Sequence, residues 1–224
     1  YYPENAPRAL VLLQDTSVTD SVAYSLHILA GQSFTSNLDP QQGGNPVAGP
    51  IDALAVDGAD FWMLNDDGKL RHMDFPSGEQ QQSRDLAAAN TGAIAVGRRW
   101  VAVATNNHNN NSLLHFVKRD KVGDATNIVL SDHVLHILAN RDEFYVFGQD
   151  SMFVVDENAK VVIERTAYAQ PAVRVVGIPA IGRGLGVGGG LQLQDGSFLR
   201  ISYDTNGRRF SKVSIVQGAD DWVT

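Results

Sequence analysis

The chain contains no cysteine among its 224 residues. Disulfide bonds, thiolate catalysis and thiolate metal sites are therefore excluded together. The absence does not identify a compartment, because chains without cysteine occur both in reducing cytosol and outside the cytoplasm of bacteria. An extracytoplasmic, periplasmic location is the one we favour, on the family resemblance given below.

Clustered positive charge is also scarce. The chain has 18 Lys and Arg against 25 Asp and Glu, a formal net charge of −7. No basic run exceeds two residues; the pairs are Arg98-Arg99, Lys118-Arg119 and Arg208-Arg209. Because phosphate binding needs a clustered basic surface, the composition argues against nucleic acid as a partner. Each pair is interpreted as a solvated turn or strand end.

Long apolar runs are missing. The longest, such as residues 9–13 and 101–104, fall far short of the roughly 18 residues of a membrane span. No signal peptide is recognisable. The chain starts at Tyr1 without Met and stops just after Trp222, so we expect a domain excised from a longer protein. A membrane would then be reached only through segments outside this chain.

Short strand-like segments are abundant, and they repeat. Runs rich in Val, Ile, Leu and aromatic residues alternate with Gly, Asn and Asp turns. The hairpin around Asp67-Gly68 recurs around Asp195-Gly196, and Asp-Gly favours the positive φ of tight hairpin turns. Four units of four strands each follow one another; they span residues 51–87, 93–130, 134–166 and 173–216. Their spacing of about 40 to 45 residues is typical of propeller blades.

These repeats predict an all-β, β-propeller-like fold with about four to five four-stranded antiparallel blades; a closed and an incomplete propeller are both open alternatives. Residues 1–224 form a single domain in this prediction, with N-terminal strands and a loop at 1–50 and the four repeats at 51–217. Strands at 9–13 and 24–30 could start a fifth blade, which strands from the C-terminal end would complete. The polar, Gly- and Pro-rich residues 35–50 are expected to form a loop.

A glycine-rich tract is the most conspicuous candidate site. Gly184, Gly186 and Gly189 formally match G-x-G-x-x-G, but a strand-like segment follows where a dinucleotide site needs a helix. A glycine-rich strand near the crowded propeller axis is the favoured interpretation. A ligand pocket lined by backbone stays open as an alternative, with Arg183, Gly184 and Gly186 as its contacts.

Other polar groups have structural interpretations. The acidic residues lie mostly at predicted turns, as in Asp66-Asp67, so a glycosidase pair of carboxylates is the less favoured hypothesis. No histidine pair has the spacing that places two metal ligands on one strand face. His72 and His115 occupy equivalent repeat positions, which indicates packing. We therefore expect no catalytic residue, no metal and no cofactor.

Two further residues are candidate contacts. His108 lies in the polar tract of residues 106–112, which is expected to be an exposed hairpin tip. Trp222 lies near the end of the chain and is a candidate contact for a partner. Five other aromatic residues share one repeat position, which predicts a core between blades; they are Phe61, Trp62, Trp100, Phe144 and Tyr145.

The repeating hairpins of residues 50–217 resemble the broad β-propeller class, which includes WD40, YVTN and quinoprotein-like domains. The Trp-Asp and Gly-His signatures of WD40 blades are missing, so no functional residue carries over. The opening Tyr1-Tyr2-Pro3, with Arg8 to Leu12, followed by repeats without cysteine, resembles the extracytoplasmic insert of some bacterial phosphate-type ABC transporter permeases. This resemblance implies a part of a membrane transport assembly.

The function we expect is a non-catalytic binding or regulatory module that engages a protein partner or the rest of its parent chain. A propeller that binds a small ligand or glycan is the alternative. A glycoside hydrolase is less favoured.

Overall fold

The structure is a computed structural model. It describes residues 8–15, 23–30, 33–38, 51–57, 60–65, 67–74, 80–86, 93–107, 109–140, 142–176, 189–204, 209–211 and 215–216. Within these ranges the regular structure is all β. None of these residues forms a helix with the length and apolar character that crossing a membrane requires.

The described residues form five antiparallel sheets that follow one another along the chain. The first has three strands, β1 (Arg8–Asp15), β2 (Ala23–Ala30) and β3 (Ser33–Leu38). Three four-stranded sheets come next. They contain β4 (Ile51–Asp57), β5 (Asp60–Asn65), β6 (Lys69–Asp74) and β7 (Gln80–Asp85); β8 (Ala93–Val96), β9 (Trp100–Asn106), β10 (Ser112–Lys118) and β11 (Lys121–Leu130); and β12 (Val134–Asn140), β13 (Glu143–Gly148), β14 (Ser151–Asp156) and β15 (Val162–Ala167).

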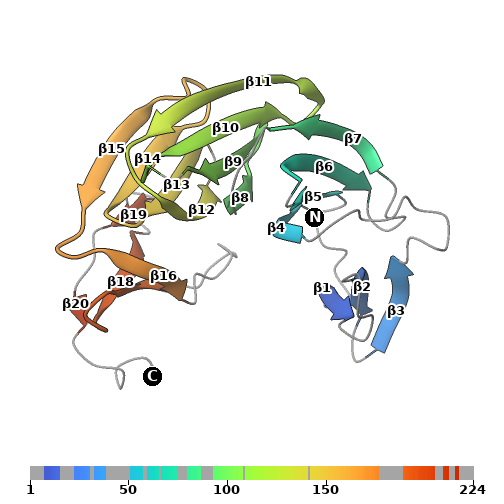
Figure 1. Ribbon diagram of the computed structural model, residues 1–224, viewed down its shortest axis with the longest axis horizontal. Helices are drawn as coiled ribbons and strands as arrows, with labels where there is room; N and C mark the ends of the chain where they lie inside the picture. Colours follow the sequence, from blue (N-terminus) through green and yellow to red (C-terminus); the bar gives the residue numbers. More distant parts are fainter. Residues whose placement is uncertain are drawn as a thin grey trace.

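The last sheet contains β16 (Ala172–Val176), β17 (Gly189–Leu193) and β18 (Phe198–Asp204), and both β19 (Arg209–Ser211) and β20 (Ile215–Val216) pair with β18. We call the sheets that start at β4, β8, β12 and β16 blades 1 to 4. Figure 1 shows the sheets following one another along an arc, with β4, β8 and β12 on its inner side and β7, β11 and β15 on its outer side. The inner strands β4, β8, β12 and β16 contact one another in that order.

This architecture confirms the predicted all-β, propeller-like fold of about four to five blades. The inner strands begin at the predicted residues, since β4 starts at Ile51, β8 at Ala93 and β12 at Val134. One expectation is wrong. The sequence predicts a loop at residues 35–38, but they belong to β3, which pairs with β2 from Ser33 to Leu38. Hydrogen bonds between the backbones of β2 and β3 define this strand, so a polar sequence does not prevent the strand from forming.

The core lies between the faces of adjacent sheets, as propeller blades require. Along β9, Ala102 and Ala104 pack toward blade 3 while Val101 and Val103 pack toward blade 1. Along β13, Phe144 and Val146 face blade 2, while Tyr145 and Phe147 face blade 4. Side chains alternate between the two faces of a strand, and here both faces are buried. Both strands are therefore apolar at most positions.

The aromatic residues at the shared repeat position behave largely as predicted. Phe61, Trp62, Phe144 and Tyr145 are fully buried, and Trp100 is partly buried against the same core. The rings of Phe116 and Phe144 pack across the interface of blades 2 and 3, with centroids 5.7 Å apart. Their neighbours Ala102 and Ala104 are small, so large and small side chains interdigitate between the two sheets.

The equivalent histidines also serve packing, as predicted. His72 stacks on Trp62 with ring centroids 4.2 Å apart and an interplanar angle of 6°. His115 is buried on β10, and its Nε2 lies 3.1 Å from Thr105 Oγ1. Burial lowers the pKa of His115, and the positive charge of Arg84 lowers it further.

The Asp-Gly hairpins confirm the turn interpretation of the acidic residues. Asp67 Oδ1 accepts a hydrogen bond from the Lys69 N–H at 2.9 Å, and Asp195 Oδ1 accepts one from the Ser197 N–H at 2.9 Å. Gly68 and Gly196 have φ angles of 72° and 85°, which side chains disfavour. Both carboxylates stabilise a turn between the second and third strands of a blade.

A buried carboxylate lies at the connection between blades 2 and 3, on the face that carries these turns. Asp132 is 2% exposed and lies in the connection between the blades. Its Oδ1 accepts the N–H groups of His133, Gln149 and Asp150, at 2.8, 2.9 and 3.1 Å. Burial raises the pKa of Asp132, although these donors favour the charged form. The carboxylate thereby holds the β13–β14 turn of blade 3.

Asn106 and Ser112 extend this network into blade 2. The single hydroxyl hydrogen of Ser112 is shared between two acceptors, the Asp132 backbone carbonyl at 2.7 Å and Asn106 Oδ1. Asn106 pairs with the backbone of Val134, accepting its N–H at 2.9 Å and donating to its carbonyl at 3.0 Å. The polar network therefore links the β9–β10 turn, the connection between the blades and the β13–β14 turn.

We predict that Gly148→Ala destabilises the protein by about 2 kcal/mol, because the new methyl group would collide with the Asp132 carboxyl group. The free energy of unfolding, measured in urea, checks this. Gly123→Ala is the control, since a Cβ at Gly123 on exposed β11 meets no atom within 4 Å. Equal stability of the two variants would contradict the role assigned to Gly148.

We also predict that stability falls on acidification from about pH 7.5 to 5.5. Because the pKa of His115 is lowered from 6.5, the folded protein binds fewer protons than the unfolded chain in this range. Each proton excluded costs at most about 1.4 kcal/mol per pH unit. His115→Gln should flatten the dependence of the urea midpoint on pH. An unchanged slope in that variant would rule out His115 as a source.

Candidate functional site

A basic groove lies on the face opposite the Asp132 network. In a four-stranded antiparallel sheet, the first and third turns lie on one edge and the second turn on the other. The groove is bounded by the first and third turns of blade 2 and the third turn of blade 3. Its volume is about 580 Å³, and its lining residues are Arg98, Arg99, Trp100, Lys118, Arg119, Asp120, Asn158 and Lys160. We call it the basic groove.

Backbone hydrogen bonds join the two turns of blade 2. The Arg119 N–H donates to the Arg99 carbonyl at 3.0 Å, and Arg119 Nη1 donates to the Gly97 carbonyl at 3.0 Å. The Gly97 N–H closes the first turn on the Trp100 carbonyl at 2.8 Å. The two dibasic pairs of the sequence are therefore held next to each other.

Glu157 fixes the blade 2 turn against blade 3. Its side chain is fully buried, and Oε1 accepts the N–H groups of Arg99 and Trp100 at 2.8 and 3.1 Å. A Cβ at Gly97 would lie 2.6 Å from Glu157 Oε1 and 2.6 Å from Phe144 Cζ. The close approach of the two blades at this point therefore depends on glycine at position 97.

Lys160 projects over the ring of Trp100. Its Nζ lies 3.8 Å from the ring centroid and donates to the Asn158 carbonyl at 3.1 Å. The backbone of Lys160 has a φ of 54°, held by its N–H bond to the Asp156 carbonyl at 2.8 Å. The Asp156 carboxylate in turn accepts the N–H of Asn158 at 2.9 Å and that of Ala159. This turn therefore positions one ammonium group and covers one aromatic face.

The groove has a strong local excess of positive charge. Five of its lining side chains are cationic and one, Asp120, is anionic. Asp120 lies 3.4 Å from the Lys118 ammonium group. The buried side chain of Glu157 lies behind the lining, where it accepts the N–H groups of Arg99 and Trp100. A local positive field in a chain with a net charge of −7 is a specific feature of this face.

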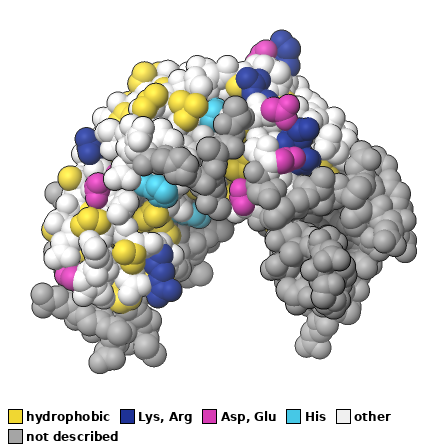
Figure 2. All heavy atoms as spheres, viewed as in Figure 1, with side chains coloured by type: hydrophobic (Ala, Val, Ile, Leu, Met, Phe, Trp, Pro, Cys, Tyr) yellow, Lys and Arg dark blue, Asp and Glu magenta, His cyan; other side chains and the backbone are white. Residues whose placement is uncertain are grey.

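Outside the basic groove, charges of both signs are interspersed. On the face shown in Figure 2, basic and acidic side chains lie side by side over β6 and β7. Lys69 and Asp85 pair there at 3.5 Å, and Arg71 and Asp67 at 3.0 Å. Burial alone would raise the pKa of Asp67, but the hydrogen bonds from Arg71 and the Lys69 amide hold it below its usual value. Interspersed charges of this kind create little net field.

The predicted contact residues fall outside the part of the chain that the structure describes. These are His108, Arg183, Gly184, Gly186 and Trp222, and they stay predictions. The interpretation of Arg98-Arg99 and Lys118-Arg119 as turns or strand ends is confirmed. The antiparallel topology also brings the two pairs together. The sequence did carry a signal for this proximity, because one pair precedes and the other follows two consecutive strands of one blade.

The described residues offer little for metal chemistry. Within those ranges, no three His, Asp or Glu side chains converge on a common point. The groove itself presents ammonium and guanidinium groups, which repel metal ions and attract anions.

No family model matches the chain, and no curated protein matches its sequence. Solved structures do match. BamB from Moraxella catarrhalis aligns with a TM-score of 0.60 at 12% identity, over 94% of this chain and 65% of that one. The WD40 domain of Toxoplasma gondii coronin aligns with a TM-score of 0.58 at 13% identity, over 95% and 64%. The RRP9 WD40 repeats align with a TM-score of 0.56 at 13% identity, over 76% and 52%.

This chain therefore has the β-propeller fold. It spans less than two thirds of the length of each of these three structures. Identities this low establish a shared architecture and carry no function across.

We predict that Glu157→Ala destabilises the protein by about 1 to 2 kcal/mol, because two partly buried N–H groups lose their acceptor. Glu157→Gln should cost less, since an amide oxygen can still accept. Glu164→Ala on exposed β15 is the control and should lie within about 0.5 kcal/mol of the parent. Urea unfolding measures all three. A Glu157→Ala variant as stable as the control would show that Glu157 does not hold the turn.

Proposed function

We propose that this chain is a non-catalytic binding module that holds a protein partner on the face bearing the basic groove. The observation that carries the proposal is the groove itself. It is assembled from three turns of two neighbouring blades and holds five cationic side chains. Function on propellers and other rigid folds is concentrated in such loops.

The chemistry of the lining supports binding over catalysis. The groove's titratable side chains are Lys and Arg, with Asp120 as the one carboxylate among the lining residues, close to Lys118. A glycosidase needs two carboxylates flanking the scissile bond. Among the described turns, the carboxylates of Asp67, Asp156 and Asp195 are engaged by backbone N–H groups. These contacts favour structural roles for those acids.

A protein partner fits the groove better than a glycan does. Sugar recognition commonly uses an open aromatic face for stacking, and one face of Trp100 is occupied by the Lys160 ammonium group. The groove is also shared by two blades and carries charge that a neutral sugar does not complement. The glycan- or ligand-binding propeller therefore stays the alternative.

The assembly we propose is an extracytoplasmic part of a bacterial membrane transport system, of the phosphate-type ABC permease kind. This finer proposal rests on the resemblance of the N-terminal residues. The gene sequence on either side of the region encoding this chain tests it, because membrane helices encoded there would support it. Flanking sequence of a different class would oppose it.

We predict that a photo-crosslinking amino acid at Asn158 captures a discrete partner in the cells that produce this protein. Asn158 is exposed and lines the groove. Asn127, an exposed asparagine on the outer strand β11, is the matched control and should yield no such adduct. The Asn158 adduct should decrease at least about fivefold when Arg99→Glu is added, as expected for a charge-dependent contact. Equal adducts from both positions would contradict the proposal.

A further inference from the structure

We infer that the basic groove recognises an acidic peptide segment of the partner, one that carries several Asp or Glu side chains within a short stretch. This inference rests on the proposed function and specifies its partner. Its first basis is charge. The lining has five cations and one anion, whereas the whole chain is net negative. The groove is therefore a positive site within acidic surroundings, which suits a short anionic segment.

The second basis is the type of cation. Arg98 and Arg99 occupy one turn, and Arg99 Nη1 donates to Asn158 Oδ1 at 3.3 Å. A guanidinium group has five N–H donors in a planar fork, so Arg99 retains donors for a carboxylate. Arginine matches the two oxygens of a carboxylate in a bidentate pair. Two adjacent arginines therefore suit neighbouring carboxylates of one peptide.

The third basis is preorganisation. Lys160 is held over Trp100 at 3.8 Å and by the Asn158 carbonyl at 3.1 Å. The Arg99 backbone is held by Glu157, and the Arg119 side chain by the Gly97 carbonyl. Cationic groups that are already ordered lose less conformational entropy when an anion binds. The groove can therefore attract a flexible acidic segment without rearranging.

Other anions fit the groove less well. A long nucleic acid would extend beyond it onto an acidic protein, and bases would lack the ring face that Lys160 covers. A flat bilayer cannot enter a recess of about 580 Å³ between turns. A single phosphate would occupy only a small part of that volume. An extended peptide with repeated carboxylates matches both its size and its charge.

The test measures binding of a fluorescent peptide of about a dozen residues, half of them Glu, by anisotropy. We expect a Kd of about 10–100 µM at about 50 mM salt, weakening as salt screens the charges. A peptide with Gln in place of every Glu should bind at least about tenfold more weakly. Equal binding of the two peptides would overturn the inference.

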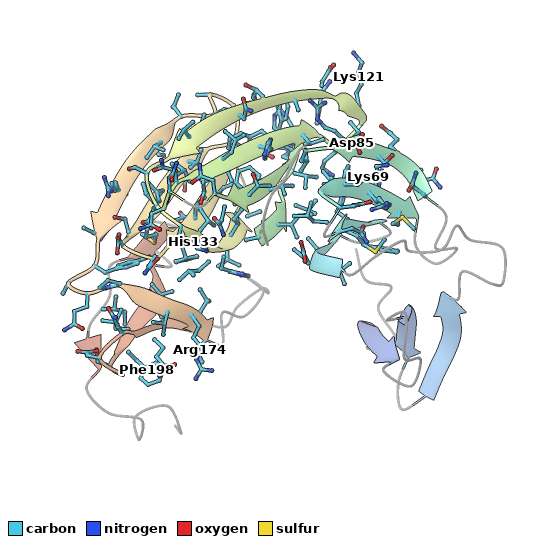
Figure 3. The ribbon with its side chains drawn as sticks, in the orientation of Figure 1. Lys69, Asp85, Lys121, His133, Arg174 and Phe198 are labelled. Atoms are coloured by element: carbon cyan, nitrogen blue, oxygen red, sulfur yellow. The ribbon has the colours of Figure 1, made fainter. Side chains whose placement is uncertain are left out.

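The variants locate the binding. Arg99→Gln combined with Lys118→Gln should weaken binding of the Glu peptide about tenfold, because two groove charges are lost. Lys69→Gln combined with Arg174→Gln removes the same charge outside the groove and should change binding less than about twofold. Figure 3 shows Lys69 on β6 and Arg174 on β16, in different blades. Equal losses in both pairs would indicate a general field and would overturn the inference. Circular dichroism melts confirm that each variant is folded.

Competition separates the anion classes. Inorganic phosphate and vesicles of phosphatidylserine and phosphatidylcholine are added to the complex of the protein with the Glu peptide. The inference is supported if phosphate competes only as well as chloride at equal ionic strength and the vesicles do not compete. It is overturned if phosphate or vesicles displace the peptide at lower concentrations than free glutamate does. Crosslinking at Asn158 without binding of the Glu peptide would refute this inference and leave the proposed function standing.

Discussion

The constraint on which this structure depends is that each blade buries both faces of its sheet only against neighbouring blades. Between blades 2 and 3 a buried carboxylate lies on each face of the propeller, at either end of the apolar contact. Asp132 holds the β13–β14 turn on one face, and Glu157 holds the β8–β9 turn on the other. Both carboxylates accept backbone N–H groups, which suits turns whose amides have no partner in the sheet. Gly148 and Gly97 permit these close approaches.

The basic groove is a consequence of the same arrangement. Glu157 draws the Arg99 turn against the turn that carries Asn158 and Lys160, and the Arg119 backbone adds the third turn. Contacts that stabilise the interface thus also collect cations from two blades on one face. Such a site can attract an anionic segment while the rest of the chain stays acidic and resists nonspecific association.

How well each strand could be predicted follows from its place in the blade. The starts of β4, β8 and β12 agree with the sequence, because the apolar runs of these inner strands are clear. The outer strands agree less well. The strand β11 begins at Lys121, five residues before the predicted start, and β7 runs from Gln80 although its residues are polar. These exposed strands are defined by backbone hydrogen bonds, and their side-chain pattern is therefore a poor guide to where they begin and end.

By itself, the sequence determined the fold class, the repeat spacing, the buried aromatic positions and the turn roles of Asp67 and Asp195. Those features depend on local sequence patterns and on the alternation of side chains along a strand, and both are visible in a single sequence. Only the tertiary structure decided that Arg98-Arg99, Lys118-Arg119 and Lys160 form one groove, and that Asp132 and Glu157 close a blade interface. These residues lie up to about sixty positions apart, and their meeting depends on strand pairing and blade packing. No local pattern encodes such a convergence of turns.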